Sequence, residues 1–130
     1  MIYHMLPADL WQQQRSDQPY HTETLQTEGF IHCTGEPELL LRVANNFYRS
    51  EVGKFVILCL DEPRITSEVL WEQVGFHRFP HVYGPINLDA IMAVVEFPRE
   101  VDGRFVLPSN LPESAPDLDI MDQIHTLFTH

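Results

Sequence analysis

The chain has 130 residues, with 8 Lys and Arg against 19 Asp and Glu, a formal net charge of -11. This length fits one compact domain, and the 44% apolar and 21% charged residues are ordinary for a globular protein, which excludes a disordered chain or a coiled coil. Because nucleic acids bind chiefly through Lys and Arg on their phosphates, the charge argues against a nucleic-acid polymer as partner, but not against a small phosphorylated ligand. No apolar run approaches the roughly 18 residues that span a bilayer, and a signal-peptide pattern is missing, so we expect a cytoplasmic protein without a membrane partner.

The first part of the chain predicts two strands and two helices. Residues 2–6 are apolar and end at Pro7, which predicts a strand, and a Pro and an acid at the start of residues 7–14 suit a helix. Residues 22–28 read as irregular or as one helical turn, and a strand over 30–33 follows Gly29.

The clearest helix comes next and runs to about Arg49. Thr34 is its predicted N-cap, and Leu40, Leu41, Ala44, Phe47 and Tyr48 recur at three- and four-residue spacing.

The second part of the chain is rich in strand signals. Residues 55–60 predict a strand buried on both faces, residues 67–74 alternate loosely as a strand does, and residues 91–97 predict another. Residues 75–85 carry Pro, Gly and His, which favours a structured loop or edge. We also expect one turn at residues 87–90 and a hairpin turn at residues 102–103, which leads into residues 104–108.

The chain therefore predicts one globular domain over residues 1–108 and an acidic, Pro-containing tail over 109–130. In the tail, Ile120, Ile124, Leu127 and Phe128 share one helical face, so a short amphipathic helix is expected to dock on the domain or on a second copy, making an oligomer. The expected fold class is α+β, with a mixed, largely antiparallel sheet flanked by two N-terminal helices.

Four of the seven histidines, namely His4, His32, His77 and His81, lie in or beside apolar segments, where a polar ring must find a partner. If their strands adjoin, His4, His32 and His81 converge at one sheet edge. The alternative for each is a histidine whose nitrogens are satisfied by backbone or by an acid. His32 and His81 lead directly into Gly- or Pro-bearing loops, where binding groups are often found.

Three further residues join this candidate site. Bulky neighbours flank Glu72, and burial would raise its pKa and suit it to acid–base work or to orienting an imidazole. Tyr83 can stack on a flat ligand, and Thr34 is a candidate ligand contact. The alternatives are a solvent-facing Glu72 and a core Tyr83. Cys33 is a weak nucleophile candidate because adjacent strand residues such as His32 and Cys33 point to opposite faces.

Metal and phosphate motifs are largely missing from the sequence. Zinc on His4, His32 and His81 is chemically allowed, yet their spacing matches no metal motif. Gly-rich phosphate loops of the dinucleotide or P-loop type are absent as well.

Several segments carry a resemblance. Ile2-Tyr3-His4, Gly29-Phe30-Ile31-His32-Cys33, Trp71-Glu72 and Phe79-Pro80-His81-Val82-Tyr83-Gly84-Pro85 occur in this order over residues 1–108. In this pattern the chain resembles a bacterial and plant family known as domain of unknown function 952. The resemblance implies a fold similar to that of the ADP-ribosyltransferases, in which residues such as these surround a nicotinamide dinucleotide. It makes His4 and His32 ligand-holding residues, places Glu72 or His81 at the cleft, and suggests NAD as a ligand.

The leading hypothesis is a His-lined cleft that binds a nucleotide-like or phosphorylated small molecule, with ADP-ribosyl transfer as the related chemistry. His32, His81 and Glu72 are the predicted catalytic residues, and His4, Thr34 and Tyr83 the predicted substrate contacts. The alternatives are a noncatalytic binding or interaction module with structural histidines, and a metal-dependent hydrolase.

Overall fold

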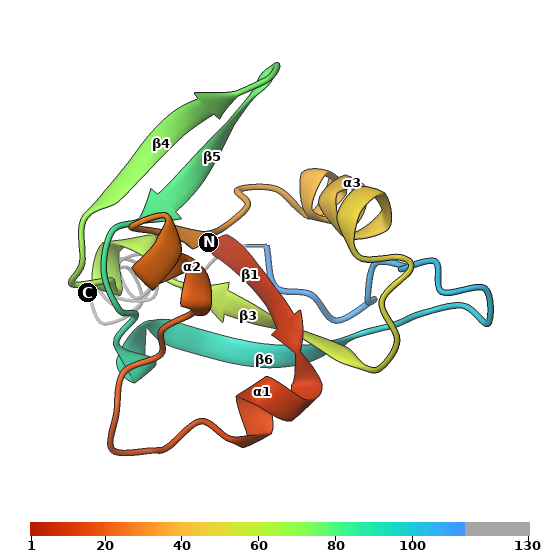
Figure 1. The fold of residues 1–130 in the computed structure, drawn as a ribbon, viewed down its shortest axis with the longest axis horizontal. Coiled ribbons are helices and arrows are strands. Elements are labelled where there is room, and N and C mark those ends of the chain that lie inside the picture. The colour runs from red at the N-terminus through yellow and green to blue at the C-terminus, as the bar shows by residue number, and fades with distance from the viewer. Residues whose placement is uncertain (114–130) are drawn as a thin grey trace, which may run out of the picture.

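The computed structural model describes residues 1–113, so the helix expected within residues 119–128 lies outside the described part. The elements, in chain order, are β1 (Ile2–Pro7), α1 (Ala8–Gln12), α2 (Glu23–Thr27), β2 (Ile31–His32), α3 (Pro37–Phe47), β3 (Phe55–Leu60), η1 (Glu62–Arg64), β4 (Val69–Val74), β5 (His77–Val82), η2 (Leu88–Ala90) and β6 (Ile91–Phe97). Figure 1 shows β4 and β5 as a hairpin that projects from the rest of the fold. Within residues 1–113 no helix has the length and apolar character that crossing a membrane requires.

The strands form two three-stranded sheets, ordered β1-β3-β6 and β2-β5-β4, and every pairing is antiparallel. The α+β class and the antiparallel character are confirmed, but the expectation of one continuous sheet was wrong. The first sheet meets the second through a single bridge, in which Tyr3 and Thr34 exchange N–H to O=C bonds of 2.8 Å each. Thr34 lies two residues beyond the end of β2, so this isolated bridge does not join β2 to the first sheet.

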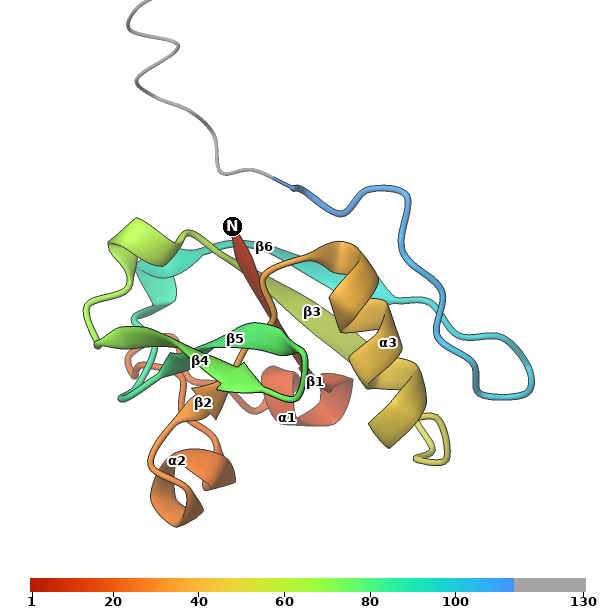
Figure 2. The same ribbon diagram turned by 90° about the horizontal axis from the view of Figure 1, so that it is seen from above.

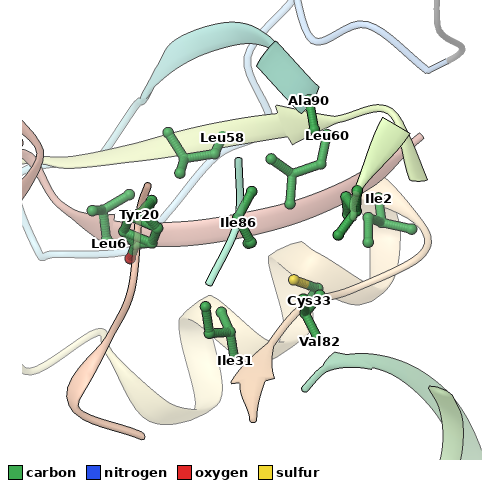
Figure 3. Packing of buried hydrophobic residues seen from close by; sticks show 11 residues of the cluster. Ile2, Leu6, Tyr20, Ile31, Cys33, Leu58, Leu60, Val82, Ile86 and Ala90 are labelled. Carbon is green, nitrogen blue, oxygen red and sulfur yellow. The ribbon is translucent and has the colours of Figure 1, made fainter. Parts of the chain in front are cut away.

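Two apolar clusters hold the layers together. The first fills the space between the two sheets and includes Ile2, Leu58, Ile31 and Val82 (Figure 3). The second lies on the opposite face of the first sheet, where Leu40 of α3 packs with side chains from β1 and β3. The period of two along β1 therefore sends alternate side chains to the two clusters.

The start of α3 differs from the expectation. Its N-cap is Glu36, and Thr34 was wrongly predicted to hold that position. Thr34 is committed instead to the bridge with Tyr3, and Pro37 opens the helix three residues later.

Residues 77–82 form β5, the middle strand of the second sheet, where a loop or edge was expected. Pro80 is tolerated in β5 because the pairing of β5 with β2 stops just before it. Its carbonyl accepts from the Cys33 N–H at 3.1 Å, while β2 itself pairs only over Ile31 and His32. The N–H that proline lacks therefore falls at the end of a ladder.

Residues 104–108 do not continue as a strand; they contribute one bridge, between Arg99 and Phe105. The Arg99 guanidinium lies 4.4 Å from the Phe105 ring centroid and donates to the carbonyls of Gly103, Gly53 and Arg49. Further along, the Tyr3 hydroxyl donates to the Pro112 carbonyl at 2.6 Å.

Candidate functional site

A cleft of about 660 Å³ opens at the edge of β1, between α3 and the outer face of the second sheet. In Figure 2, α3 lies on one side of β1 and β2 lies on the other. Much of the cleft wall is apolar, from Phe30, Leu40, Val43, Phe47, Val74 and Phe79. Its polar lining includes His4, Glu28, His32, Thr34 and His81. Among the described residues that line it, none is Lys or Arg.

Strand register explains why two histidines meet here. His32 of β2 lies directly opposite His81 of β5, and both side chains point away from the core between the sheets. Their ring centroids lie 5.5 Å apart, edge to face. Phe30 precedes His32 by two residues and therefore shares its face, where it stacks on His81 with centroids 4.0 Å apart.

The His81 ring is buried and oriented by an acid. Its Nδ1 lies 2.9 Å from Oε1 of Glu72, which is placed on the neighbouring strand β4. Since a carboxylate only accepts, Nδ1–H donates and the neutral ring keeps its lone pair on Nε2. Within residues 1–113, Nε2 forms no hydrogen bond. Every buried side-chain nitrogen in this range has a hydrogen-bond partner, so Nε2 is not buried, and its lone pair is accessible from the cleft.

The expectation that burial raises the pKa of Glu72 was wrong, because its side chain is 40% exposed. The hydrogen bond from the Tyr83 hydroxyl, followed by that from His81, holds the pKa of Glu72 below its usual value. The same contact with Glu72 raises the pKa of Tyr83. Glu72 and Tyr83 thus act on the cleft through His81, and the centroid of the Tyr83 ring lies 5.4 Å from that of Phe30.

Tyr83→Phe is expected to raise the pKa of Glu72 toward its ordinary value, since the strongest stabilising contact of the carboxylate is lost. Carbon-13 NMR titration of the Glu72 carboxyl measures this. Glu68, which directly precedes β4, serves as the internal control. An unchanged Glu72 titration would contradict the assigned contact.

His4 lines the cleft, but neither of its ring nitrogens is free. Nδ1 lies 2.6 Å from the His32 carbonyl oxygen and so donates to it, and Nε2 accepts from the Tyr20 hydroxyl at 2.7 Å. Burial, opposed by the bond to His32, lowers the pKa of His4 to about 4. The ring is therefore neutral at pH 7 and joins β1 to β2 and to the loop at Tyr20.

His32 is the most accessible of the three imidazoles, with its side chain 51% exposed. Its Nε2 lies 2.8 Å from Oε2 of Glu28, four residues earlier along the chain. Thr34 is buried beside it, and no hydrogen bond to its hydroxyl is formed within residues 1–113. Every buried side-chain oxygen within residues 1–113 has a hydrogen-bond partner. The Thr34 hydroxyl therefore cannot be fully buried, and it faces the cleft.

The backbone of β1 contributes a donor and an acceptor that the sequence did not predict. The Tyr3 N–H and C=O bond to Thr34, away from β3, so those of Met5, two residues on, point to the same outer edge. Among the described residues they have no backbone partner, and Met5 lines the cleft. Phe30 was also missed, although its two-residue spacing from His32 was a signal for it. Met5 had no such signal, because the outer edge of β1 is set by the sheet order.

Thiol and metal chemistry find little support in the described part of the chain. Burial raises the pKa of the Cys33 thiol well above its ordinary value, and its side chain belongs to the core between the sheets. Residues 1–113 hold no group of three or more His, Cys, Asp or Glu side chains arranged for a metal ion.

Solved structures of one protein, CC0527 from Caulobacter crescentus, are similar to this chain. Its crystal structure and that of a double mutant each have a TM-score of 0.70 at 23% identity, covering 82% of this chain and 93% of the other. The solution NMR structure has a TM-score of 0.69 at 23% identity, covering 87% and 97%. At this identity the similarity shows a shared fold.

No curated protein matches the chain. The ADP-ribosyltransferase-like relationship stays a prediction, as do the catalytic and substrate-binding roles of the residues named above. A family model described as "Protein of unknown function (DUF952)" matches residues 5–94, and the chain therefore belongs to that family.

Proposed function

We propose that the cleft binds a nucleotide-like small molecule through its flat ring, and that NAD, with its nicotinamide group, is the ligand class that fits best. The observation that carries this proposal is the convergence, in one cleft, of an aromatic wall, the free edge of β1 and the oriented ring of His81. Pockets of this size with a few placed polar groups are typical of small-molecule sites.

A carboxamide suits the edge of β1. It offers one N–H donor side and one carbonyl acceptor, which match the C=O and N–H of Met5. Phe79 supplies a ring face for an aromatic heterocycle, and Phe30, which is stacked on His81, adds apolar wall beside it. Since no Lys or Arg occurs among the described lining residues, the phosphates of such a ligand would stay outside the cleft.

The related chemistry is transfer of the ADP-ribosyl group. In that reaction the bond between the nicotinamide nitrogen and the ribose carbon breaks, and an acceptor oxygen or nitrogen bonds to the same carbon. We assign His81 Nε2 to take the proton of the acceptor, and Glu72 to hold the ring in the tautomer that this requires. We assign the half-exposed His32, which is paired with Glu28, to contact the acceptor.

Thermal unfolding with NAD, nicotinamide, ADP-ribose and a phosphosugar tests the proposal. A ligand at about 100 times its Kd stabilises the native state by about 2.7 kcal/mol, a shift on the order of 10 °C for a chain of this size. We expect NAD and nicotinamide to raise the melting temperature and ADP-ribose, which lacks the ring, to do so less.

Two variants at one position sharpen this experiment. Met5→Pro removes the N–H that points into the cleft and leaves the ladder between β1 and β3 intact, whereas Met5→Leu keeps it. The nicotinamide shift should be lost in the first and kept in the second. No shift with any ring-bearing ligand, or equal shifts in both variants, would contradict the proposal.

A noncatalytic binding module is the second candidate. The observation in its favour is His4, whose two nitrogens are both bound within the protein. Turnover of NAD to free nicotinamide, followed by NMR, separates the two candidates, because a binding module leaves NAD intact.

A further inference from the structure

Within residues 1–113, no strand pairs with the outer edge of β4. β4 ends the second sheet, and its inner partner is β5. The Glu68 carbonyl accepts from the N–H of Tyr83, the residue after β5, at 2.8 Å. Because backbone groups alternate in direction along a strand, the N–H and C=O groups of Leu70, Glu72 and Val74 also point toward β5. The N–H and C=O groups of Val69, Trp71 and Gln73 therefore point outward, and among the described residues they have no backbone partner.

This edge lacks the features that usually keep sheet edges apart. Natural edge strands carry Lys, Pro or a bulge. β4 has the sequence Val-Leu-Trp-Glu-Gln-Val, and its pairing with β5 has no register shift. Its one charge, Glu72, is held toward β5 by His81 and Tyr83. By contrast β6, an outer strand of the first sheet, has a register shift, an exposed Glu96 and a following Pro98.

Apolar side chains are exposed on both faces of β4. Leu70 and Trp71 are each 42% exposed and Val74 is 54% exposed, while Phe76 in the adjoining turn is 97% exposed. An open edge flanked by such side chains is suited to pairing with another extended strand.

We propose that β4 pairs with β4 of a second copy of this chain, antiparallel, about a two-fold axis at Trp71. Pairing through the outward groups is possible about any residue of β4, and registers centred on Trp71 or Glu72 pair more of the strand than the others. In a register centred on Leu70, Glu68 of one chain lies opposite Glu72 of the other. In a register centred on Glu72, the two Glu72 carboxylates lie opposite each other. Of the two registers that pair most of the strand, the centre at Trp71 avoids directly opposed like charges, which destabilise a strand pair.

The same register brings the exposed apolar groups together. Trp71 lies opposite the Trp71 of the other copy, and Leu70 lies diagonal to the other Leu70 and Val74 on one face. The dimer joins the two second sheets into one sheet of twice the width. A single strand pair buries less than the roughly 1,000 Å² of a stable interface, and each chain carries a net charge of -11, so the dimer is reversible and strengthens with salt.

Amide hydrogen exchange tests the proposal with an internal control. At about 1 mM protein and moderate salt, the amides of Val69, Trp71 and Gln73 should exchange slowly, and on dilution to about 20 μM they should exchange fast. The amides of Leu70, Glu72 and Val74 should be protected at both concentrations. Fast exchange of the outward amides throughout, or a dimer that leaves them unprotected, overturns the proposal.

Sedimentation of two variants with the same charge change tests the edge itself. Gln73→Lys places a cation on the paired edge and should weaken the dimer by about tenfold or more. Gln12→Lys on α1 should leave it as strong or slightly stronger, because it lowers the net negative charge. Equal dimer strength in both variants, or a monomeric wild type at about 1 mM, overturns the proposal.

Discussion

Lowering the pH from about 7 to about 4 is expected to remove roughly 3 kcal/mol from the free energy of unfolding through His4 alone. Burial lowers the pKa of His4 from 6.5 to about 4 in the native protein. Between these values the unfolded chain binds a proton that the native chain does not. The contribution of neutral His4 is therefore complete above about pH 6.5 and is lost as the pH falls to about 4.

Urea unfolding at a series of pH values measures this effect. His4→Gln keeps a donor for the His32 carbonyl and an acceptor for Tyr20, but carries no titrating group, so its stability should fall less steeply below pH 6.5. His77→Gln, which removes an exposed histidine, is the matched control and should follow the wild type. Parallel curves for His4→Gln and the wild type would show that His4 is not buried as a neutral ring.

Leu40→Ala is expected to cost about 2–4 kcal/mol of stability and to widen the cleft. Leu40 is 1% exposed, and it joins α3 to the first sheet while forming part of the cleft wall. Removal of its side chain leaves a cavity in the second cluster that α3 cannot fill without moving. Denaturant unfolding measures the loss.

Leu39→Ala, one residue earlier, is the control for Leu40→Ala. Leu39 is partly exposed and belongs to neither apolar cluster, so it should lose far less stability. Equal losses at the two positions would contradict the packing of α3 described above.

Much of the strand content followed from the sequence, because apolar runs with β-branched residues have few other stable forms. The strands expected over residues 2–6, 55–60, 67–74 and 91–97 correspond to β1, β3, β4 and β6. β5 could not be predicted, since Pro80 is unfavourable in a middle strand unless the neighbouring ladder ends there. The end of that ladder is set by the two-residue length of β2, which depends on the tertiary structure and cannot be predicted from the local sequence.

The sequence predicted several of the residues that line the cleft, but it did not predict how they are arranged. Period-two spacing places His32 on one face of β2, but its position opposite His81 depends on the register between β2 and β5. The environment of Glu72 was misjudged because Trp71 points to the other face of β4, and Leu70, which shares the face of Glu72, is itself 42% exposed. The edge groups of Met5 are invisible in sequence, since every residue has an N–H and a C=O and topology alone decides which stay unpaired.

The central claim is that the edge of β1 and the ring of His81 face one ligand-binding cleft, and an NMR titration with nicotinamide tests it most directly. The account predicts that the amide of Met5 and the Nε2 resonance of His81 shift together and saturate at the same ligand concentration, while His77 stays unchanged. Saturable shifts confined to other surfaces, or none at either group up to the solubility of nicotinamide, would contradict it.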